Sequence, residues 1–251
     1  MSAAEVPDEN TAHLESAGDL RRSFHNKLDE LREGIARLGA RVTESIPRAT
    51  EILLTQDLEG AELMVLADDE IDSKALALED ACYEVLALQS PVASDLRRVV
   101  AAMRIIAEIE RSADLAVNIC KAARRIYGHQ LDPRLRGIIH KMGSQAHKLY
   151  KEATEAYLTD DAARAAALDD MDSYLDDLQR EFVQAIFTSH STEKIELQVA
   201  VQLAVVARFY ERIGDHAVNI GERVRFVVTG YVPEHQGAAR YAERQAASDL
   251  E

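Results

Sequence analysis

The apolar residues of this chain recur every three or four positions over long stretches, which is the spacing of amphipathic helices. Leu20, Phe24 and Leu28 begin the first such stretch, and the apolar stripe continues beyond Pro47. A proline within a continuing stripe favours a kink over an end to the helix. We therefore expect one long, kinked helix from about Leu20 to the residues before Asp57.

Capping and turn residues divide the rest of the chain into five further helices. Ser90 before Pro91 is typical of a cap followed by a first helical residue, and Asp132-Pro133 repeats the pattern. Gly230 is a typical helix end. The expected helices run from about Gly60 to Gln89, Pro91 to Gly128, Pro133 to Leu158, Asp161 to Thr188 and Thr192 to Gly230.

A segment of the chain occurs twice, with an offset of 101 positions between residues 110–119, ERSADLAVNI, and residues 211–220, ERIGDHAVNI. A long-range repeat indicates two copies of one unit that pack on each other. Together with the helices, it predicts an all-α protein of two tandem antiparallel three-helix bundles. We expect a disordered leader at 1–19, the first repeat at 20–130, the second at 131–230 and a polar tail at 231–251.

Charge and cysteine content narrow the class of protein. The formal net charge of −15 argues against nucleic-acid binding and suits cations or basic protein surfaces. No apolar stretch is long enough to span a membrane and no hydrophobic signal segment opens the chain, so we expect a cytoplasmic protein. Cys82 and Cys120 are too few for a disulfide framework, and we expect buried free thiols.

Each copy of the repeat places two carboxylates four residues apart on one helix face. They are Glu110 and Asp114 in the first copy and Glu211 and Asp215 in the second. Like charges at this spacing repel each other by roughly 0.2–0.5 kcal/mol, which a bound cation would offset.

The neighbouring helix should add carboxylates to each pair. If the second and third helices of a repeat form a hairpin, Asp69 and Asp72 face the first pair, and Asp169 and Asp172 face the second. Converging carboxylates are typical of an oxygen-only site for hard cations. Two other interpretations stay open: a solvated acidic face without a ligand, and a docking surface for basic residues of a partner.

The sequence contains no recognisable catalytic motif. It contains no Glu-x-x-His, no Gly-rich phosphate loop, no zinc-protease motif and no nucleophile elbow, so it nominates no catalytic residue. His216 has Leu115 at its matching position, and we expect it to be a surface imidazole. The alternative to a binding protein is an enzyme with a carboxylate-bridged multinuclear metal centre in a helical bundle.

The twice-used Glu-Arg-x-x-Asp-x-Ala-x-Asn-Ile resembles the signature of the PhoU family, accessory regulators of bacterial phosphate uptake. Residues 69–72 (DEID), 90–97 (SPVASDLR) and the opening Phe24-His25-x-x-Leu28-x-x-Leu31 are similar to further landmarks of that family. The resemblance covers about residues 20–230.

This resemblance implies two three-helix bundles with a carboxylate metal site on each, holding multinuclear iron or Mg²⁺, Mn²⁺ or Zn²⁺, and no enzymatic activity. By residue match, Glu110, Asp114, Glu211 and Asp215 take the ligand role, and the four aspartates on the facing helices are secondary candidates. The resemblance also implies a negative regulator that couples the ATPase of a phosphate ABC transporter to a sensor histidine kinase. We expect a homodimer that meets the membrane only through those complexes.

The two copies of the motif differ at one packing position. The first copy has Ser112-Ala113 where the second has Ile213-Gly214. The extra methyl group of Ala113 falls where close helix contact is wanted. We therefore expect the second site to be the better occupied of the two.

Overall fold

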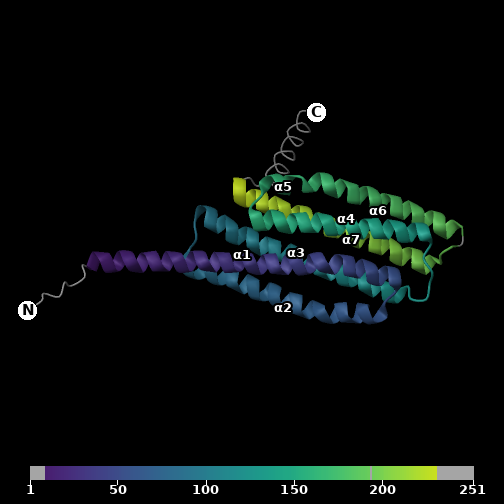
Figure 1. Ribbon diagram of the computed structural model, residues 1–251, viewed down its shortest axis with the longest axis horizontal. Helices are drawn as coiled ribbons and strands as arrows, with labels where there is room; N and C mark the ends of the chain where they lie inside the picture. The colour runs from purple at the N-terminus through teal and green to yellow at the C-terminus, as the bar shows by residue number, and fades with distance from the viewer. Residues whose placement is uncertain (1–8, 193, 231–251) are drawn as a thin grey trace, which may run out of the picture.

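The computed structural model describes residues 9–192 and 194–230, and the regular structure in these ranges is helical throughout. Figure 1 shows an elongated bundle of helices that run along one another. The helices are α1 (Glu9–Thr55), α2 (Leu58–Gln89), α3 (Ala93–Arg125), α4 (Pro133–Thr159), α5 (Ala162–Ala166), α6 (Leu168–Ser191) and α7 (Leu197–Thr229). None of the described helices is long and apolar enough to cross a lipid bilayer.

The helices form two bundles of three, which confirms the predicted architecture. Helices α1, α2 and α3 make the first bundle, and α4, α7 and the α5–α6 pair make the second. Helix α3 packs on α7 and α1 packs on α4, whereas α2 and α6 lie on opposite outer sides (Figure 1). Buried side chains of both bundles therefore belong to one continuous hydrophobic core.

A polar bond inside this core ties the two bundles together. Tyr210 of α7 is fully buried, and its hydroxyl lies 2.8 Å from Oγ1 of Thr50 in α1. A buried hydroxyl needs such a partner, because leaving it unpaired costs roughly 1–3 kcal/mol.

Pro47 lies inside α1 without ending it, as predicted. Proline has no N–H group, so the carbonyl of Thr43, one turn earlier, loses its helical donor. His147 of α4 replaces that donor, with its Nδ1 2.9 Å from the Thr43 oxygen. Because a carbonyl can only accept, Nδ1 carries the proton and Nε2 of His147 has a free lone pair.

Arginines of each repeat cap a helix of the other. The side chain of Arg136 in α4 donates to the carbonyl of Leu54 in the last turn of α1, at 2.7 Å. Arg32 in α1 donates in the same way to Leu158 in the last turn of α4. Both bonds satisfy carbonyls that a helix end leaves without a partner. The two arginines, like the two leucines, stand 104 residues apart.

Close contacts between α1 and α4 follow the same spacing. A Cβ atom on Gly39 would lie 3.1 Å from the side chain of Thr154, and one on Gly143 would lie 2.3 Å from that of Thr50. The glycines and the threonines are each 104 residues apart. The first helices of the repeats therefore match at an offset of 104, and not at the 101 of the signature motif.

Helices α1 and α3 do not start where the sequence predicts. Helix α1 already begins at Glu9, so the part of the expected leader from there on is helical, because each added residue extends the helix by one hydrogen bond. Residues 1–8 and the expected tail at 231–251 lie outside the described residues. Helix α3 begins at Ala93, and Ser90 does not cap it as expected. Ser90 ends α2, where it adopts the left-handed conformation with φ of 44°.

The second repeat also deviates in one element. The single helix expected from Asp161 to Thr188 is divided at Ala167 into α5 and α6. Asp161 caps the first piece as expected, because its carboxylate accepts from the backbone N–H groups of Ala163 and Arg164. The break places Leu168 in the core at the start of α6.

Candidate functional site

The first acidic cluster lies between α2 and α3 and consists of Asp68, Asp72, Glu110 and Asp114. Asp68 is only 9% exposed, and its Oδ1 has no hydrogen-bond partner among the described residues. Burial, followed by the charges of Asp72 and Asp114, raises the pKa of Asp68 to about 6. Burial also raises the pKa of Glu110, with Asp114 and Asp72 adding to the effect.

The second acidic cluster lies between α6 and α7 and consists of Asp172, Asp176 and Asp215, together with Glu211, one turn before Asp215 on α7. Burial, and then the charges of Asp176 and Asp215, raise the pKa of Asp172 to about 7. Burial raises the pKa of Asp215 as well, against the lowering effect of Arg208. One oxygen each of Asp172 and Glu211 is buried without a hydrogen-bond partner in the described part of the chain.

The clusters bring together the predicted motif carboxylates, but the facing aspartates differ from the predicted match. In the structure Asp68 corresponds to Asp172, at the offset of 104 that also relates α1 to α4. Asp72 therefore corresponds to Asp176 and not to Asp172. The predicted partners Asp69 and Asp169 are exposed at the edges of the clusters. Asp69 has only a minor effect on the pKa of Asp68, and Asp169 has only a minor effect on that of Asp172.

The reason for this difference is the connection between the second and third helices. The expected helices end at Thr188 and resume at Thr192, which centres the turn near His190-Ser191, but α6 continues through Ser191 and α7 starts only at Leu197. Asp176 was missed in consequence. The glycines and threonines of α1 and α4 match at an offset of 104 positions, and the same offset applied to Asp72 gives Asp176.

Gly214 lets a carboxylate of α6 lie directly against α7. A Cβ atom at this position would be 2.2 Å from Oδ1 of Asp172 and 2.8 Å from Cδ2 of Leu175. In the first repeat, Ala113 stands at the matching position and lines a cavity of about 180 Å³ together with Asp68. Close helix contact at this position is thus a property of the second cluster.

Basic side chains enter the two clusters differently. Arg208 pairs with Glu211 one turn along α7. Glu110, the matching residue, makes no ion pair with any described residue, whereas Glu70 of α2 is paired with Arg41 at 2.7 and 2.8 Å. The first cluster therefore keeps its motif glutamate unpaired.

The donor set fits a hard cation in its chemistry. All the ligand candidates are carboxylates, two aspartates present buried oxygens without partners, and a positive ion would offset the repulsion within each cluster. As placed, no three His, Cys, Asp or Glu side chains among the described residues form a ready metal-binding group. The ligand role of Glu110, Asp114, Glu211 and Asp215 stays a prediction.

His216 is buried, contrary to the surface position that we expected. It lies between α7 and α3 with 6% exposure, and its Nδ1 is 3.1 Å from Oγ of Ser112. That hydroxyl already donates to the carbonyl of Glu108, so Nδ1 donates to Ser112. Burial lowers the pKa of His216 to about 4. The matching residue, Leu115, is buried too, and this apolar match was the signal for an interior position.

The two cysteines have the predicted environment. Cys82 and Cys120 are free and buried, and burial raises the pKa of each thiol to about 12. Neither thiol is therefore a ready nucleophile or metal ligand.

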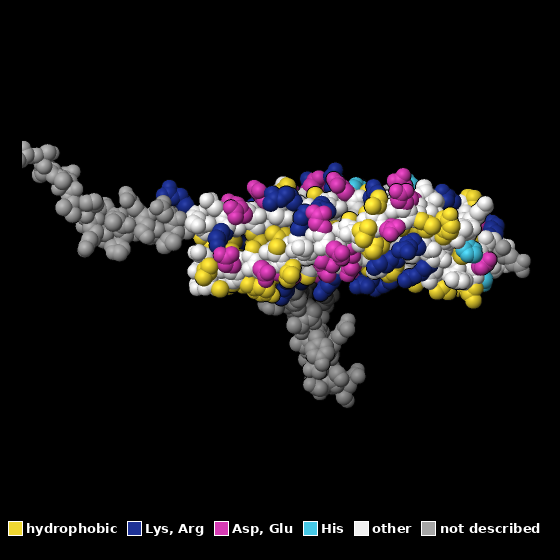
Figure 2. Space-filling view, turned by 90° about the horizontal axis from the view of Figure 1, so that it is seen from below, with side chains coloured by type: hydrophobic (Ala, Val, Ile, Leu, Met, Phe, Trp, Pro, Cys, Tyr) yellow, Lys and Arg dark blue, Asp and Glu magenta, His cyan; other side chains and the backbone are white. Residues whose placement is uncertain are grey.

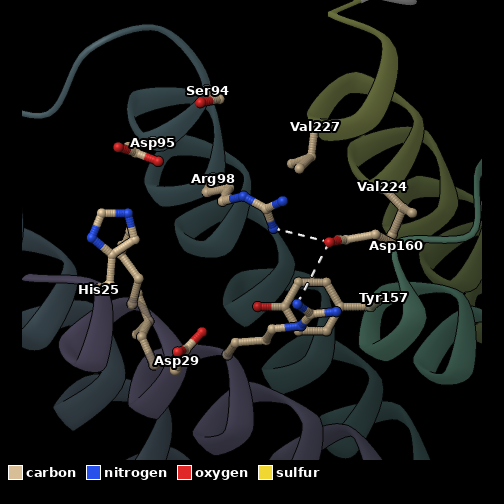
Figure 3. A pocket seen from close by; sticks show the side chains of 12 residues that line it. His25, Asp29, Ser94, Asp95, Arg98, Tyr157, Asp160, Val224 and Val227 are labelled. Carbon is tan, nitrogen blue, oxygen red and sulfur yellow. Dashed lines mark hydrogen bonds and ion pairs between the residues drawn. The ribbon is translucent and has the colours of Figure 1, made fainter. Parts of the chain in front are cut away.

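A separate cavity of about 380 Å³ lies where α1, α3, α4 and α7 meet at one end of the bundle. Figure 3 shows Arg98 directed at Asp160, with Tyr157 beside the pair. The carboxylate of Asp160 lies 3.0 Å from Arg98 and 3.5 Å from Arg32. No residue of the acidic clusters lines this cavity, which sequence reasoning did not identify.

The fold and the clusters define a class of protein: a duplicated three-helix bundle with one carboxylate cluster on each repeat. A family model described as the PhoU domain matches residues 35–123 and 139–224, one copy in each repeat. The chain belongs to the PhoU family.

Individual relatives agree with this assignment. The Mycobacterium tuberculosis protein called phosphate-specific transport system accessory protein PhoU homolog 2 is 34% identical over 85% of this chain and 100% of its own length. A homolog from Clostridium acetobutylicum is 29% identical over 84% of this chain and 96% of its own.

Solved structures show the same fold. The phosphate transport system regulatory protein PhoU from Streptococcus pneumoniae superposes with a TM-score of 0.77 at 27% identity, covering 83% of this chain and 98% of that one. PhoU from Pseudomonas aeruginosa superposes with a TM-score of 0.78 at 27% identity, over 83% and 100%.

Proposed function

We propose that this chain is a non-enzymatic regulator of phosphate uptake, acting in the cytoplasm as an accessory protein of a phosphate-specific transport system. The observation that carries the proposal is the PhoU signature in both repeats, each copy facing an aspartate with a buried oxygen that has no hydrogen-bond partner among the described residues. The names of the relatives, which refer to phosphate-specific transport, support the same role.

In this proposal the acidic clusters hold metal ions, either multinuclear iron or divalent ions such as Mg²⁺, Mn²⁺ or Zn²⁺. Glu110 and Asp114 are the primary ligands on the first repeat, and Glu211 and Asp215 are those on the second. Asp68 and Asp172 add the buried oxygens that lack other partners. Bound cations supply positive charge that removes the repulsion between carboxylates. Each repeat then keeps its outer helix fixed against its motif helix.

The fixed shape is the signal that partner proteins detect. We propose that a homodimer of the chain couples the ATPase of the phosphate ABC transporter to a sensor histidine kinase. When phosphate is plentiful, this coupling represses the phosphate-starvation response. A protein that lacks the four ligand carboxylates would lose this shape and would no longer repress the response.

The test is elemental analysis of protein purified without a metal-affinity tag, paired with a phosphate-starvation reporter in phosphate-rich cells. The variant carries Glu110→Ala, Asp114→Ala, Glu211→Ala and Asp215→Ala. The matched control removes four exposed carboxylates elsewhere: Glu30→Ala, Glu62→Ala, Asp80→Ala and Glu181→Ala. We expect about one metal equivalent or more in the wild type and the control, and loss of both metal and repression in the variant.

Repression that persists in the four-carboxylate variant would refute the proposal. A metal-free wild type whose repression still depends on the four carboxylates would instead identify the clusters as docking surfaces for a basic partner. Catalytic turnover that is lost in Glu211→Ala while the fold persists would overturn the non-enzymatic assignment.

A further inference from the structure

The outer face of α4 is basic, on a chain whose formal net charge is −15. From Pro133 to Lys151 the helix contains no acidic residue. At a rise of 1.5 Å per residue, this stretch is about 27 Å long. We call its exposed basic side chains the α4 face: Arg134, Arg136, His140, Lys141, Lys148 and Lys151.

Most of this positive charge is not neutralised within the molecule. Among the described residues, the side chains of Arg134, Lys141 and Lys148 make no ion pair or hydrogen bond. Lys151 has only a 3.8 Å contact with Glu155, and the Lys151 side chain is largely exposed. Elsewhere on the bundle, arginines such as Arg41 are paired with carboxylates. The α4 face therefore has charge available for an external partner.

A groove of about 470 Å³ runs beside the α4 face, between α4 and α1. Pro47 and Leu54 give it apolar walls, and the missing side chain of Gly143 allows the two helices to approach closely. His147 also lines the groove, and its Nε2 is free to accept a hydrogen bond because Nδ1 donates to Thr43. Glu51 is the one acidic residue among those lining the groove.

We propose that the α4 face and this groove bind an acidic amphipathic segment of a partner protein. The carboxylates of the segment would lie on the lysines and arginines of α4, and its apolar side chains would enter the groove. The complementary charge supports this occupant, since an isolated basic face on an acidic protein selects for negative partners.

The surface suits a peptide better than an anionic membrane. A membrane-binding helix presents large apolar side chains that enter the lipid. No large hydrophobic side chain is exposed between Pro133 and Lys151. The groove, in addition, can receive side chains that a flat lipid surface does not offer. This site is separate from the acidic clusters, so the proposal goes beyond the metal-dependent function above.

The test measures binding of a fluorescent amphipathic peptide of Glu and Leu, about four helical turns long. A peptide with Lys in place of Glu serves as the comparison probe. The charge variant is Lys141→Glu with Lys148→Glu. Its matched control is Arg124→Glu with Arg125→Glu, which changes the net charge equally on exposed residues of α3. A third variant, Ser144→Phe, fills the groove without changing charge.

We expect saturable binding of the acidic peptide only, weakened about tenfold in the charge variant and near wild type in the control. Ser144→Phe should also weaken binding, which a purely electrostatic contact would not show. Metal content should be normal in all variants, so failure here is distinct from failure of the metal proposal. The inference is overturned if the acidic peptide does not bind, if the charge variant binds equally well, or if wild type floats with phosphatidylglycerol-rich vesicles and the charge variant does not.

Discussion

The two acidic clusters are built from the same motif, yet their surroundings differ. In the first, Glu110 has no ion pair with a described residue, and Ala113 and Asp68 border a small cavity. In the second, Arg208 holds Glu211, and Gly214 lets the helices close on Asp172. Burial raises the pKa of the central aspartate in both, to about 6 for Asp68, where Lys121 counteracts the shift, and to about 7 for Asp172.

This difference teaches that a repeated motif sets the charge pattern, whereas local packing sets the properties of each carboxylate. At the point where the helices touch, the two clusters differ by a single methyl group, present at Ala113 and absent at Gly214. Asp172, whose pKa is raised further than that of Asp68, is the carboxylate that gains more from a proton or a cation. Four changes would break or sharpen the comparison.

The largest effect is expected from removing the charge of Asp172. Because its pKa is about 7 in the folded state and 3.8 as an ordinary side chain, the folded protein binds more protons, and metal-free protein loses stability as pH rises through this window. Asp172→Asn should stabilise metal-free protein by ~2 kcal/mol at about pH 8. This is roughly half of the free energy that corresponds to the pKa shift, because the side chain keeps some contact with water. Asp68→Asn should give a smaller gain.

Urea denaturation with a chelator at about pH 8 and about pH 5 checks this prediction. The gain should shrink at the lower pH, where wild-type Asp172 is already protonated. A destabilising Asp172→Asn, or a gain that does not depend on pH, would contradict it.

The next effect tests the packing difference directly. Gly214→Ala introduces a methyl group that must displace the Asp172 carboxylate and Leu175. Overpacking costs about 1–3 kcal/mol, and the better helix propensity of alanine recovers about 1 kcal/mol, so we expect a net loss near 1 kcal/mol.

The matched change is Ala113→Gly in the first cluster, which loses about 1 kcal/mol of helix propensity without moving a carboxylate. Both variants should therefore be similarly destabilised, while only Gly214→Ala loses metal. Equal metal content in the two variants, measured by elemental analysis, would show that the methyl group does not distinguish the clusters.

A smaller effect concerns His216, whose counterpart is Leu115. The pKa of His216 is lowered from 6.5 to about 4, so the unfolded chain binds its proton first and stability is lost as pH falls from 6.5 toward 4. His216→Leu should change stability by less than about 1 kcal/mol at neutral pH and remove this acid sensitivity. Thermal unfolding of both proteins across that range measures the difference. His140→Leu, on the exposed face of α4, is the control and should leave the acid sensitivity intact.

The smallest effect is expected at Arg208, which is largely exposed. Arg208→Ala should cost less than about 0.5 kcal/mol of stability, since exposed ion pairs contribute little. It frees Glu211 and removes a positive charge, so the second cluster should bind Mn²⁺ a few-fold more tightly. Calorimetric titration with Mn²⁺ measures this, and weaker binding would mean that Arg208 positions Glu211 instead of blocking it.

The sequence predicts most of the fold because its helix signals are local. Asp132 and Asp161 cap the helices that they were expected to start, and Gly230 ends α7 in the left-handed conformation. Ser90 was misassigned because one residue can serve either the helix before it or the helix after it. The break at Ala167 lies in an alanine-rich segment, whose composition gives no sign of an interruption.

The site was only partly predictable for a different reason. Glu110, Asp114, Glu211 and Asp215 lie within one repeat copy each, so their spacing is readable directly. Which aspartates face the motif depends on the register between two neighbouring helices. A misplaced connection between α6 and α7 shifts this register by about one helical turn, and Asp176 was missed for that reason. The burial of His216 depends on how the two repeats pack, and in the sequence only its match with the apolar Leu115 indicates it.

The reciprocal arginine caps bear on what half of this chain would do alone. Arg32 reaches the end of α4, and Arg136 reaches the end of α1, so neither repeat satisfies its own helix terminus. A fragment with only the first repeat would also expose the side of α3 that α7 covers. Two such fragments, arranged as the repeats are, would cap and cover each other. The chain is in this sense a covalently linked dimer of repeats. Its two halves should therefore associate when they are produced separately.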